Sequence, residues 1–517
     1  MGTSDNSAEA VVNRIAELVD PGVRWQRSLW NTGLVLSLKE IVEASDAVGA
    51  GALNPASVKW LADSAKGRVT KDPGAGSAIE QKAIATLLTR DLSSGGANYL
   101  ELLNWIAAIE DAYLERWIAA VSSTEDRPSR ETSARALSAY LLDQGFSPTA
   151  LTAWLKSLPI AKTEDLFEAA RSLVAASGED YEVLILFEKP PPARIARPSE
   201  WRDAKEASSW LLAQGFEPRR QHGGLLLSIH ARDASSAANL AADVVDRLLA
   251  RVSVGMRDTV RVSPSAFVRG VPTPVALRRV RKVEVRALER EDRLLFLDRS
   301  GPVDDALELV SHLNGAPAPV AVTGGWSAIE SLLSGAGDTG KVVTAERFAY
   351  LVACSWPRAE LTTLAWARQK QEPSDALGES LAASQTNRER CQVVLDHLGS
   401  EGDLGLEAAR DRLGQRRIEK LVKEPRSGLQ AIQRQTVASL RRLYRQRNLV
   451  VHGGQVAGEA LSATLRTVAP LVGAGLDRIT HAYLTEGTEA LDLAARARFE
   501  VERAGSAGAP PITALLE

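Results

Sequence analysis

Apolar side chains recur at the three- and four-residue spacing of an amphipathic helix over most of this chain, and only the middle, from 178 to about 320, departs from it. Helices are expected in the first part at 8–20, 29–46, 54–66, 78–92, 98–122, 131–144, 148–158 and 163–176. From 326 to about 505 the pattern is again helical. These patterns predict a mainly α fold with a smaller α+β region.

The middle of the chain carries the alternating and β-branched patterns that are typical of strands. Strands are expected at 181–187, 223–230, 258–263, 280–288 and 293–298. The second of these is followed directly by a strongly helical segment over 234–252. The sequence therefore predicts a small α+β region between two helical parts.

Four parts of the chain follow from these patterns: an N-terminal helical region over 1–125, an α+β region with short strands over 126–320, a helical bundle over 321–505 and a flexible tail over 506–517. The first boundary is placed at the polar segment 122–129, which contains Pro128. A length of 517 residues fits two to four domains.

The composition is that of an ordinary soluble globular protein, with 45% hydrophobic and 25% charged residues. Cys354 and Cys391 are the only cysteines, so no disulfide framework is expected and a reducing cytoplasm fits the chain. No signal region opens the sequence and no apolar run reaches membrane-spanning length, so no membrane association is expected. The His and Cys residues show no metal-ligand spacing, so neither a metal nor another cofactor is expected.

One helical stretch, 441–454, carries a combination of residues that suits chemistry on phosphate groups. The apolar stripe of this stretch includes Tyr444 and resumes at Val450, and between them Arg447 and Asn448 take positions expected to face the core. A charged group in an apolar stripe is costly to bury unless it is paired or used. The interruption therefore marks a candidate site.

The spacing of the site residues places them near the end of the helix. Asn448 and His452 are four apart and share one helix face, and the long side chain of Arg447 can swing to the same edge. Gly453 and Gly454 predict the end of the helix, so His452 lies in the last turn, where the helix dipole favours the imidazolium form. A histidine that exchanges protons beside a permanent positive charge suits attack on a phosphodiester.

The charge distribution supports a phosphate-binding role for the same stretch. Between Asp411 and His452 there are eleven Arg and Lys against three Asp and Glu, a local balance of +8. Since the whole chain carries −3, the remainder carries −11. A basic strip that ends at the candidate site is the pattern expected for contacts with a nucleic-acid backbone, although a solvated helix rich in arginine would look the same.

The Arg447-Asn448-x-x-x-His452 sequence resembles the signature of the HEPN superfamily, Arg-x(4–6)-His with Asn after Arg. The resemblance extends more weakly over 320–505, where Trp326-Ser-Ala-Ile-Glu330 is similar to an early helix of large HEPN proteins. It implies a homodimeric, metal-independent endoribonuclease whose site forms where two copies of this helix meet. Such proteins act in phage defence or toxin-like growth arrest, so RNA and an antitoxin or a phage-derived trigger are the implied partners.

The resemblance also implies roles for individual residues. His452 would be the acid/base, Arg447 would hold the charge of the transition state, and Asn448 would fix the geometry or bind phosphate. Around them, Tyr444, Arg441 and Arg445 would bind RNA, and Glu330 would orient Arg447 or His452. The large regions before the bundle would be regulatory.

Other interpretations of the same residues stay open. His452 could simply cap helix carbonyls while Arg447 forms a structural ion pair. In a second alternative the bundle is a catalytically silent scaffold that senses or binds a partner protein or nucleic acid. Arg390 and His397 also match the short Arg…His pattern, but their acidic neighbours favour a solvated helix face. The segment 335–341 copies most of a P-loop, but Val342 offers no hydroxyl and no strand precedes it.

Overall fold

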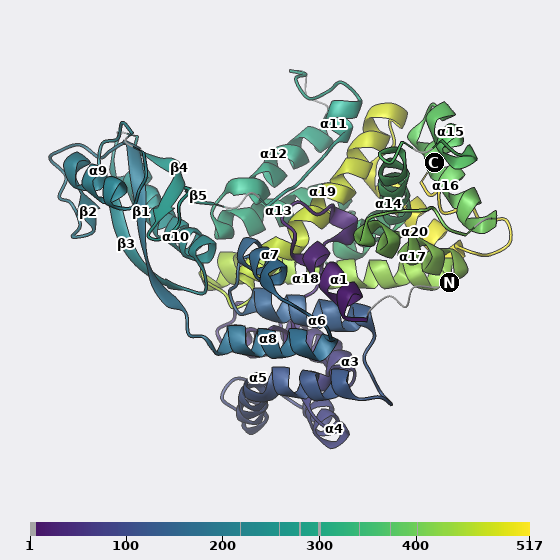
Figure 1. Ribbon diagram of the computed structural model, residues 1–517, viewed down its shortest axis with the longest axis horizontal. Coiled ribbons are helices and arrows are strands. Elements are labelled where there is room, and N and C mark those ends of the chain that lie inside the picture. Colours follow the sequence, from purple (N-terminus) through teal and green to yellow (C-terminus); the bar gives the residue numbers. More distant parts are fainter. Residues whose placement is uncertain are drawn as a thin grey trace.

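The computed structural model describes residues 7–217, 219–257, 259–278, 281–297, 301–340, 342–372, 374–400 and 402–516. Over these residues the chain forms 20 α-helices, two short 3₁₀ helices and one five-stranded sheet (Figure 1). The expectation of a mainly α fold with a smaller α+β region is therefore confirmed. No helix in the described part of the chain combines the length and apolar content needed to cross a bilayer.

The N-terminal part is a helical unit with one hydrophobic core. Its elements are α1 (Ser7–Val19), η1 (Trp25–Arg27), α2 (Leu34–Gly49), α3 (Pro55–Val69), η2 (Pro73–Ala75), α4 (Ala78–Leu87), α5 (Ala97–Ser122), α6 (Arg130–Asp143), α7 (Pro148–Ser157) and α8 (Thr163–Ala175). All eight α-helices lie close to the predicted ranges. Good N-caps explain several of the starts, such as Ser77, which forms a capping box with Glu80.

The boundary expected at 125 is wrong, because the core of this unit continues across it. The Trp117 ring on α5 stacks on Phe167 of α8 with centroids 5.4 Å apart, and Tyr113 stacks on Tyr140 of α6 at 4.6 Å. Buried residues from α1 to α8 belong to one cluster. The polar break at 122–129 is thus a surface loop within a unit that ends near 175, and its composition did not distinguish a loop from a linker.

The sheet unit follows as a five-stranded antiparallel sheet in the order β2-β3-β1-β4-β5. Its elements are β1 (Glu179–Lys189), β2 (Trp201–Arg202), α9 (Ala204–Ala213), β3 (Gly224–Ala231), α10 (Ala234–Gly255), β4 (Arg261–Val268) and β5 (Val275–Ala276). Helix α10 covers one face, against Val183 and Ile185, and α9 covers the other, against Leu184 and Leu186. The central strand is continuously apolar because both of its faces are buried.

Two of the predicted strands are not found. The described residues of 280–288 form an irregular segment followed by α11 (Ala287–Arg290), and those of 293–298 form turns and irregular backbone. Residues 280 and 298 lie outside the described part of the chain. The inward alternation was correct, since Val283 and Val285 pack on the bundle core, but helices rather than strands lie beside them.

The C-terminal part is a helical bundle with its own core. Its helices are α12 (Pro302–Gly315), α13 (Ala318–Leu333), α14 (Val342–Gln369), α15 (Ala376–Ala383), α16 (Asn387–Ser400), α17 (Ala409–Lys423), α18 (Pro425–Gly453), α19 (Leu461–Glu486) and α20 (Ala490–Arg503). Val303 and Leu313 of α12 are buried in this core, so the bundle begins near 302 and not at 321.

The C-terminal tail is packed on the bundle instead of hanging free. Its composition predicted a flexible segment over 506–517, but Ile512, Leu515 and Leu516 are buried in the bundle core. Arg358 donates to the Leu515 carbonyl at 2.8 Å, and the Leu516 amide donates to Glu500 at 2.6 Å. Burial of the two leucines at the end of the tail stabilises an ordered conformation, although the Pro, Gly and Ala residues of the tail favour flexibility.

The N-terminal unit and the bundle are joined by buried ion pairs. Arg27 of η1 pairs with Glu360 of α14 at 2.9 Å and with Asp411 of α17 at 2.7 Å. Arg417 on α17 reaches Glu17 of α1 at 3.2 Å and also pairs with Glu360. Figure 1 shows α1 lying between the N-terminal helices and the bundle, while the sheet unit projects to one side.

Candidate functional site

The candidate site lies at the C-terminal end of α18, a 29-residue helix that begins with Pro425 at its first turn. The helix runs through the bundle core, where Leu440 and Leu443 are buried, and its last turns reach the N-terminal unit, where Leu449 joins that core. Gly454 ends it with φ of +63°, a left-handed conformation that glycine adopts without strain. The expected end of the helix is confirmed.

Arg447, Asn448 and His452 meet at this end, as their spacing predicted. The Arg447 Nη1 donates to the Asn448 Oδ1 at 3.1 Å and lies 3.3 Å from the His452 Nε2. His452 is exposed, whereas Arg447 and Asn448 are half-buried. One guanidinium nitrogen thus links the amide and the imidazole in a small polar cluster that opens to solvent.

Not all hydrogen-bond donors of Arg447 are used within the cluster. A guanidinium has five N–H groups, and the two described contacts use only Nη1. The Nε is buried and has no acceptor among the described residues. Nη2 makes no described hydrogen bond, so it can bind an oxyanion beside His452 while Nη1 keeps its contact with Asn448.

The apolar pattern of α18 predicted that Arg447 faces the core, but other arginines of this helix are the buried ones. Arg442 and Arg445, and not Arg447, are buried, and both bind Glu40 of α2. Arg442 Nε donates to the Glu40 Oε1 at 2.6 Å and its Nη2 to Oε2 at 3.1 Å. The apolar stripe identified only the face of α18 that packs in the bundle. It did not identify the face that packs against the N-terminal unit, where Arg442 and Arg445 lie.

Glu40 is fully buried, and the two arginines hold it in the charged form. Burial by itself would raise the pKa of the Glu40 carboxyl, but Arg442 and Arg445 outweigh burial and keep that pKa below its ordinary value. In turn, burial lowers the pKa of the Arg445 guanidinium. The three groups form one buried ionic cluster beneath the exposed site.

Arg445 is consequently not available to RNA in this structure. Its side chain is 4% exposed and its guanidinium is committed to Glu40. Tyr444 is half-buried, and its ring lies 4.7 Å from that of Trp326 on α13, so only part of it can reach a ligand. Arg441 lies over the Trp60 ring of α3 at 4.1 Å and is also half-buried. Three residues were expected to bind RNA. For one of them, Arg445, the structure shows a structural role instead.

Glu330 forms a hydrogen bond with a neighbour on its own helix. Its carboxylate accepts a hydrogen bond at 2.8 Å from the indole of Trp326, one turn earlier on α13. Because Trp326 packs on Tyr444, the described link from Glu330 to the site helix goes through this aromatic pair. Whether Glu330 orients Arg447 or His452 stays a prediction.

The rival motifs fit structural roles. His397 Nε2 lies 2.9 Å from the Asp403 carbonyl oxygen, and Arg390 donates to the Ser384 carbonyl, so each stabilises its own loop. The loop 334–340 follows helix α13 and not a strand, and Lys341 lies outside the described residues. Within the described chain, no three His, Cys, Asp or Glu residues gather as a metal site would require.

The residue that sequence reasoning missed is Glu40. A signal for it exists: it is the one acidic side chain in the strongly apolar first half of α2, Leu34–Ile41. A carboxylate at such a position is expected to be paired. What the sequence did not supply was the partner, which lies about four hundred residues away along the chain.

Comparisons with models of protein families, with curated proteins and with solved structures find no match to this chain.

Proposed function

We propose that this protein is a metal-independent endoribonuclease of the HEPN type, with Arg447, Asn448 and His452 as its catalytic residues. The observation that carries the proposal is the hydrogen-bonded cluster of these three side chains at the solvent-exposed end of α18. Residues five apart on a helix do not face each other by geometry alone, so the contact between Arg447 and His452 depends on the bent path of the arginine side chain.

The proposed reaction is attack of an RNA 2′-hydroxyl on the neighbouring phosphorus. The O2′–P bond forms, the P–O5′ bond breaks, and the products are a 2′,3′-cyclic phosphate and a free 5′-hydroxyl. His452 removes the 2′-hydroxyl proton through Nε2, and the departing O5′ takes up a proton. The Nε2 lone pair becomes free for this transfer when a phosphate oxygen replaces it as the acceptor of the Arg447 Nη1 hydrogen.

Arg447 stabilises the charge that develops on the phosphate oxygens. Its planar guanidinium can bind phosphate oxygens through Nη2, which makes no described hydrogen bond, whereas Nε is buried. Asn448 holds the Nη1 side of the group, so the charge is positioned before the substrate binds. Positioning of this kind lowers the reorganisation that the reaction requires.

A second copy of the chain supplies the complementary proton-transfer group. One helix end offers a single histidine, whereas the reaction needs both a base and an acid. Val451 and Val456, which flank the site, are 47% and 61% exposed, and an isologous contact between two copies would bury them. The active form in this proposal is a homodimer with two facing α18 ends.

In the cell this enzyme would act in the cytoplasm, in phage defence or toxin-like growth arrest. The N-terminal and sheet units would regulate it, and an antitoxin or a phage-derived trigger would control them. These roles rest on the HEPN resemblance of the Arg447–His452 motif.

The test is to incubate the purified protein with total RNA, with and without EDTA. We expect fragments that end in 2′,3′-cyclic phosphate in both conditions. His452→Ala and Arg447→Ala should each reduce cleavage at least about a hundredfold, since each removes a group acting in the transition state. His222→Ala and Arg434→Ala, at exposed positions away from the cluster, should cleave normally.

Three results would contradict the proposal. Equal cleavage by wild type and His452→Ala would show that the activity belongs to another site or to a contaminant. Loss of cleavage in EDTA, with recovery in Mg²⁺, would point to another class of nuclease. No cleavage by any preparation, including the dimer, would favour the silent scaffold.

A further inference from the structure

A large cleft lies where the N-terminal unit, the sheet unit and the bundle meet. Its volume is about 1810 Å³, which exceeds the range of roughly 300–1,000 Å³ typical of small-molecule pockets. The walls come from the loop before η1, from α10, from the irregular segment 281–286 and from α14 and α19. Val456, Ala457 and Gly458, in the loop that follows His452, also line it. The cleft is therefore bordered by the loop that follows the candidate site, although Arg447, Asn448 and His452 are not in its lining.

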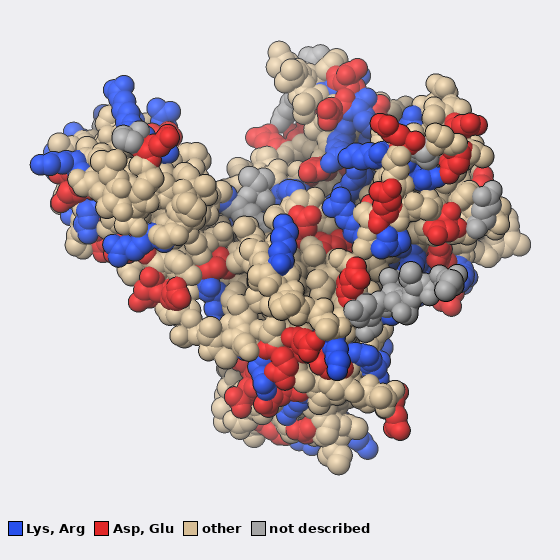
Figure 2. Space-filling view, in the orientation of Figure 1, with Lys and Arg blue, Asp and Glu red and all other residues tan. Residues whose placement is uncertain are grey.

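The cleft is more basic than the rest of the molecule. Twelve Lys and Arg line it against seven Asp and Glu, whereas the whole chain carries −3. Figure 2 shows Lys and Arg side chains gathered on the face where Figure 1 places α19. Several of these cations are paired with carboxylates: Arg278 with Asp246 and Arg290 with Asp477 within the wall, and Arg466 with Asp143 outside it. Lining cations without such a partner are available to a ligand.

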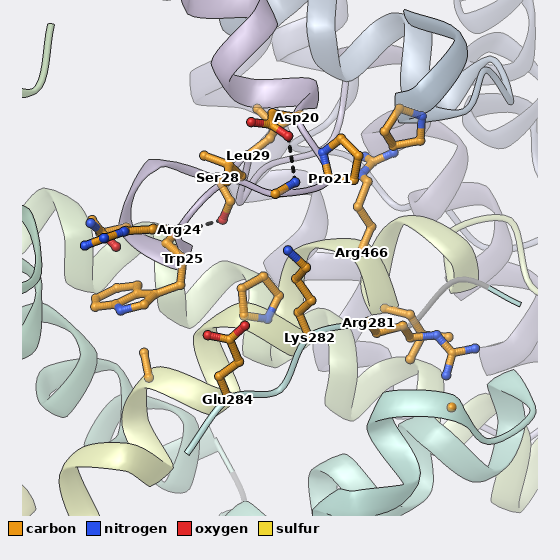
Figure 3. Close-up of a pocket in the computed structure, with 18 of the residues that line it drawn as sticks. Asp20, Pro21, Arg24, Trp25, Ser28, Leu29, Arg281, Lys282, Glu284 and Arg466 are labelled. Carbon is orange, nitrogen blue, oxygen red and sulfur yellow. Dashed lines mark hydrogen bonds between the residues drawn. The ribbon is translucent and has the colours of Figure 1, made fainter. Parts of the chain in front are cut away.

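Lys282 is the clearest of these available cations. It is exposed, and no described residue forms a hydrogen bond or ion pair with it. Its backbone φ is +53°, a left-handed conformation that costs a residue with a side chain about 1 kcal/mol or more. In Figure 3 its side chain extends into the middle of the cleft, with Arg24 and Trp25 on one side and Arg466 on the other.

The conformation of Lys282 is imposed by its neighbours. The Arg281 amide donates to the Asn314 carbonyl at 3.1 Å, and the Val283 amide donates to the Asn314 side chain at 2.6 Å. The Arg281 guanidinium donates at 2.9 Å to the Ala316 carbonyl, just after α12. Both flanks of Lys282 are thus fixed to one end of α12, and the lysine is held with its side chain toward the cleft.

Arg24 and Trp25 form the opposite wall, on a loop that is anchored in place. Gln26 donates to Thr363 of α14 at 2.8 Å, and the indole of Trp356 donates to the Gln26 carbonyl at 3.0 Å. The Trp25 ring stacks on Trp30 at a centroid distance of 6.2 Å. Burial, then Arg286 and Arg27, lower the pKa of the Arg24 guanidinium, so an anion here would relieve a repulsion between cations.

We propose that this cleft binds a single-stranded nucleic acid, with Lys282 and Arg24 on its phosphates and the Trp25 indole beside a base. A chain of nucleotides matches a cleft of this volume better than one nucleotide does. Cations that follow a backbone beside an aromatic ring are the usual means of binding single strands. The proposal rests on the proposed function in one respect: the strand bound here is the one that is cut at His452.

The experiment measures binding of a labelled single-stranded 2′-deoxy oligonucleotide to the full-length protein by fluorescence anisotropy between 50 and 200 mM salt. Such a strand has no 2′-hydroxyl and is not cut. The variants are Lys282→Gly, Arg24→Ala and the double variant. Lys282→Gly suits the left-handed position and should unfold at the same or a higher temperature than wild type. Lys205→Ala, on the exposed side of α9 and outside the cleft, is the control.

We expect each single variant to weaken binding several-fold and to reduce the slope of log affinity against log salt by about 0.7, with about twice that loss in the double variant. Lys282→Arg should bind as wild type does, and Lys205→Ala should be unchanged. Unaltered binding by the double variant would overturn the proposal. So would equal competition from polyglutamate, or competition from ATP as effective as that from the unlabelled strand.

The outcome is separable from that of the proposed function. If strand binding depends on Lys282 and Arg24 but no RNA is cleaved, the proposed ribonuclease activity is rejected and the proposed binding in the cleft is supported. RNA cleavage that depends on His452, together with no effect of the cleft variants on strand binding, would reject the cleft alone.

Discussion

Glu40 is the single residue on which the end of α18 most depends. It lies fully buried on α2 and holds Arg442 and Arg445, the two arginines that direct the last turns of α18 against the N-terminal unit. Arg447 and His452 follow within the next two turns, so their position at the surface depends on this buried cluster. A residue without any chemical role thus sets the place of the residues proposed to carry the chemistry.

Glu40→Ala should destabilise the protein by about 3–5 kcal/mol, because two buried guanidinium groups would lose their common carboxylate. Urea unfolding monitored by circular dichroism measures the change, and Glu101→Ala on the exposed face of α5 is the control. The pKa of Glu40 is lowered from 4.5 in the folded state, so its contribution is present above pH 4.5 and is lost as the pH falls through the folded value. An equal effect of both variants at pH 7 would contradict this account.

At the scale of the element, α18 combines three functions in one helix. Its first and middle turns pack in the bundle core, its last turns reach the core of the N-terminal unit at Leu449, and its end presents the candidate site. The last turn depends on Gly454, whose amide donates to the Leu449 carbonyl from a left-handed conformation. The position of His452 is therefore set by where the helix stops as well as by how it packs.

Gly454→Ala should cost about 1 kcal/mol, because alanine is strained at a φ of +63°. No atom crowds the added methyl, so the effect isolates backbone strain. We expect a lower thermal midpoint and weaker RNA cleavage, since the end of the helix shifts under His452. Gly399→Ala, in α16 with open space and no positive φ, should be neutral or slightly stabilising. Identical midpoints for the two variants would contradict the expectation.

At the scale of the molecule, the N-terminal unit completes the bundle electrostatically. Glu17 and Glu40 from that unit meet Arg417, Arg442 and Arg445, which belong to the basic strip from 411 to 452. Part of the local balance of +8 is therefore neutralised inside the protein, and the strip is not a continuous surface for phosphates. The lining of the cleft between the three units also contains more Lys and Arg than Asp and Glu.

A fragment that starts at 302, where the bundle begins, should be poorly folded on its own. It would keep Arg442 and Arg445 but lose Glu40, and it would expose Leu449, so buried charge and apolar surface would both lose their partners. Circular dichroism and size-exclusion chromatography of this fragment, beside the full chain, provide the measurement. A stable, soluble fragment with cooperative unfolding would show that the N-terminal unit is a removable cover.

The sequence by itself determined most helices, the central strands and the positions of Arg447, Asn448 and His452 at the end of a helix. These depend on local periodicity, on capping and on the two glycines after His452, which the neighbouring residues specify. The prediction from sequence was wrong where one local pattern is compatible with two structures. The polar loop at 122–129 has the composition of a linker, and the segment after 280 has the alternation of a strand. In both cases the packing partner lies far away in the sequence.

Only the tertiary structure decided which charges are buried and which remain available. Arg445 and Arg447 have the same local chemistry, yet Arg445 is committed to Glu40 and Arg447 reaches His452. The cleft, too, is built from segments between residues 18 and 516 that no local pattern connects. Pairing of charges and enclosure of space are properties of distant segments brought together, so they appear only when the chain is folded.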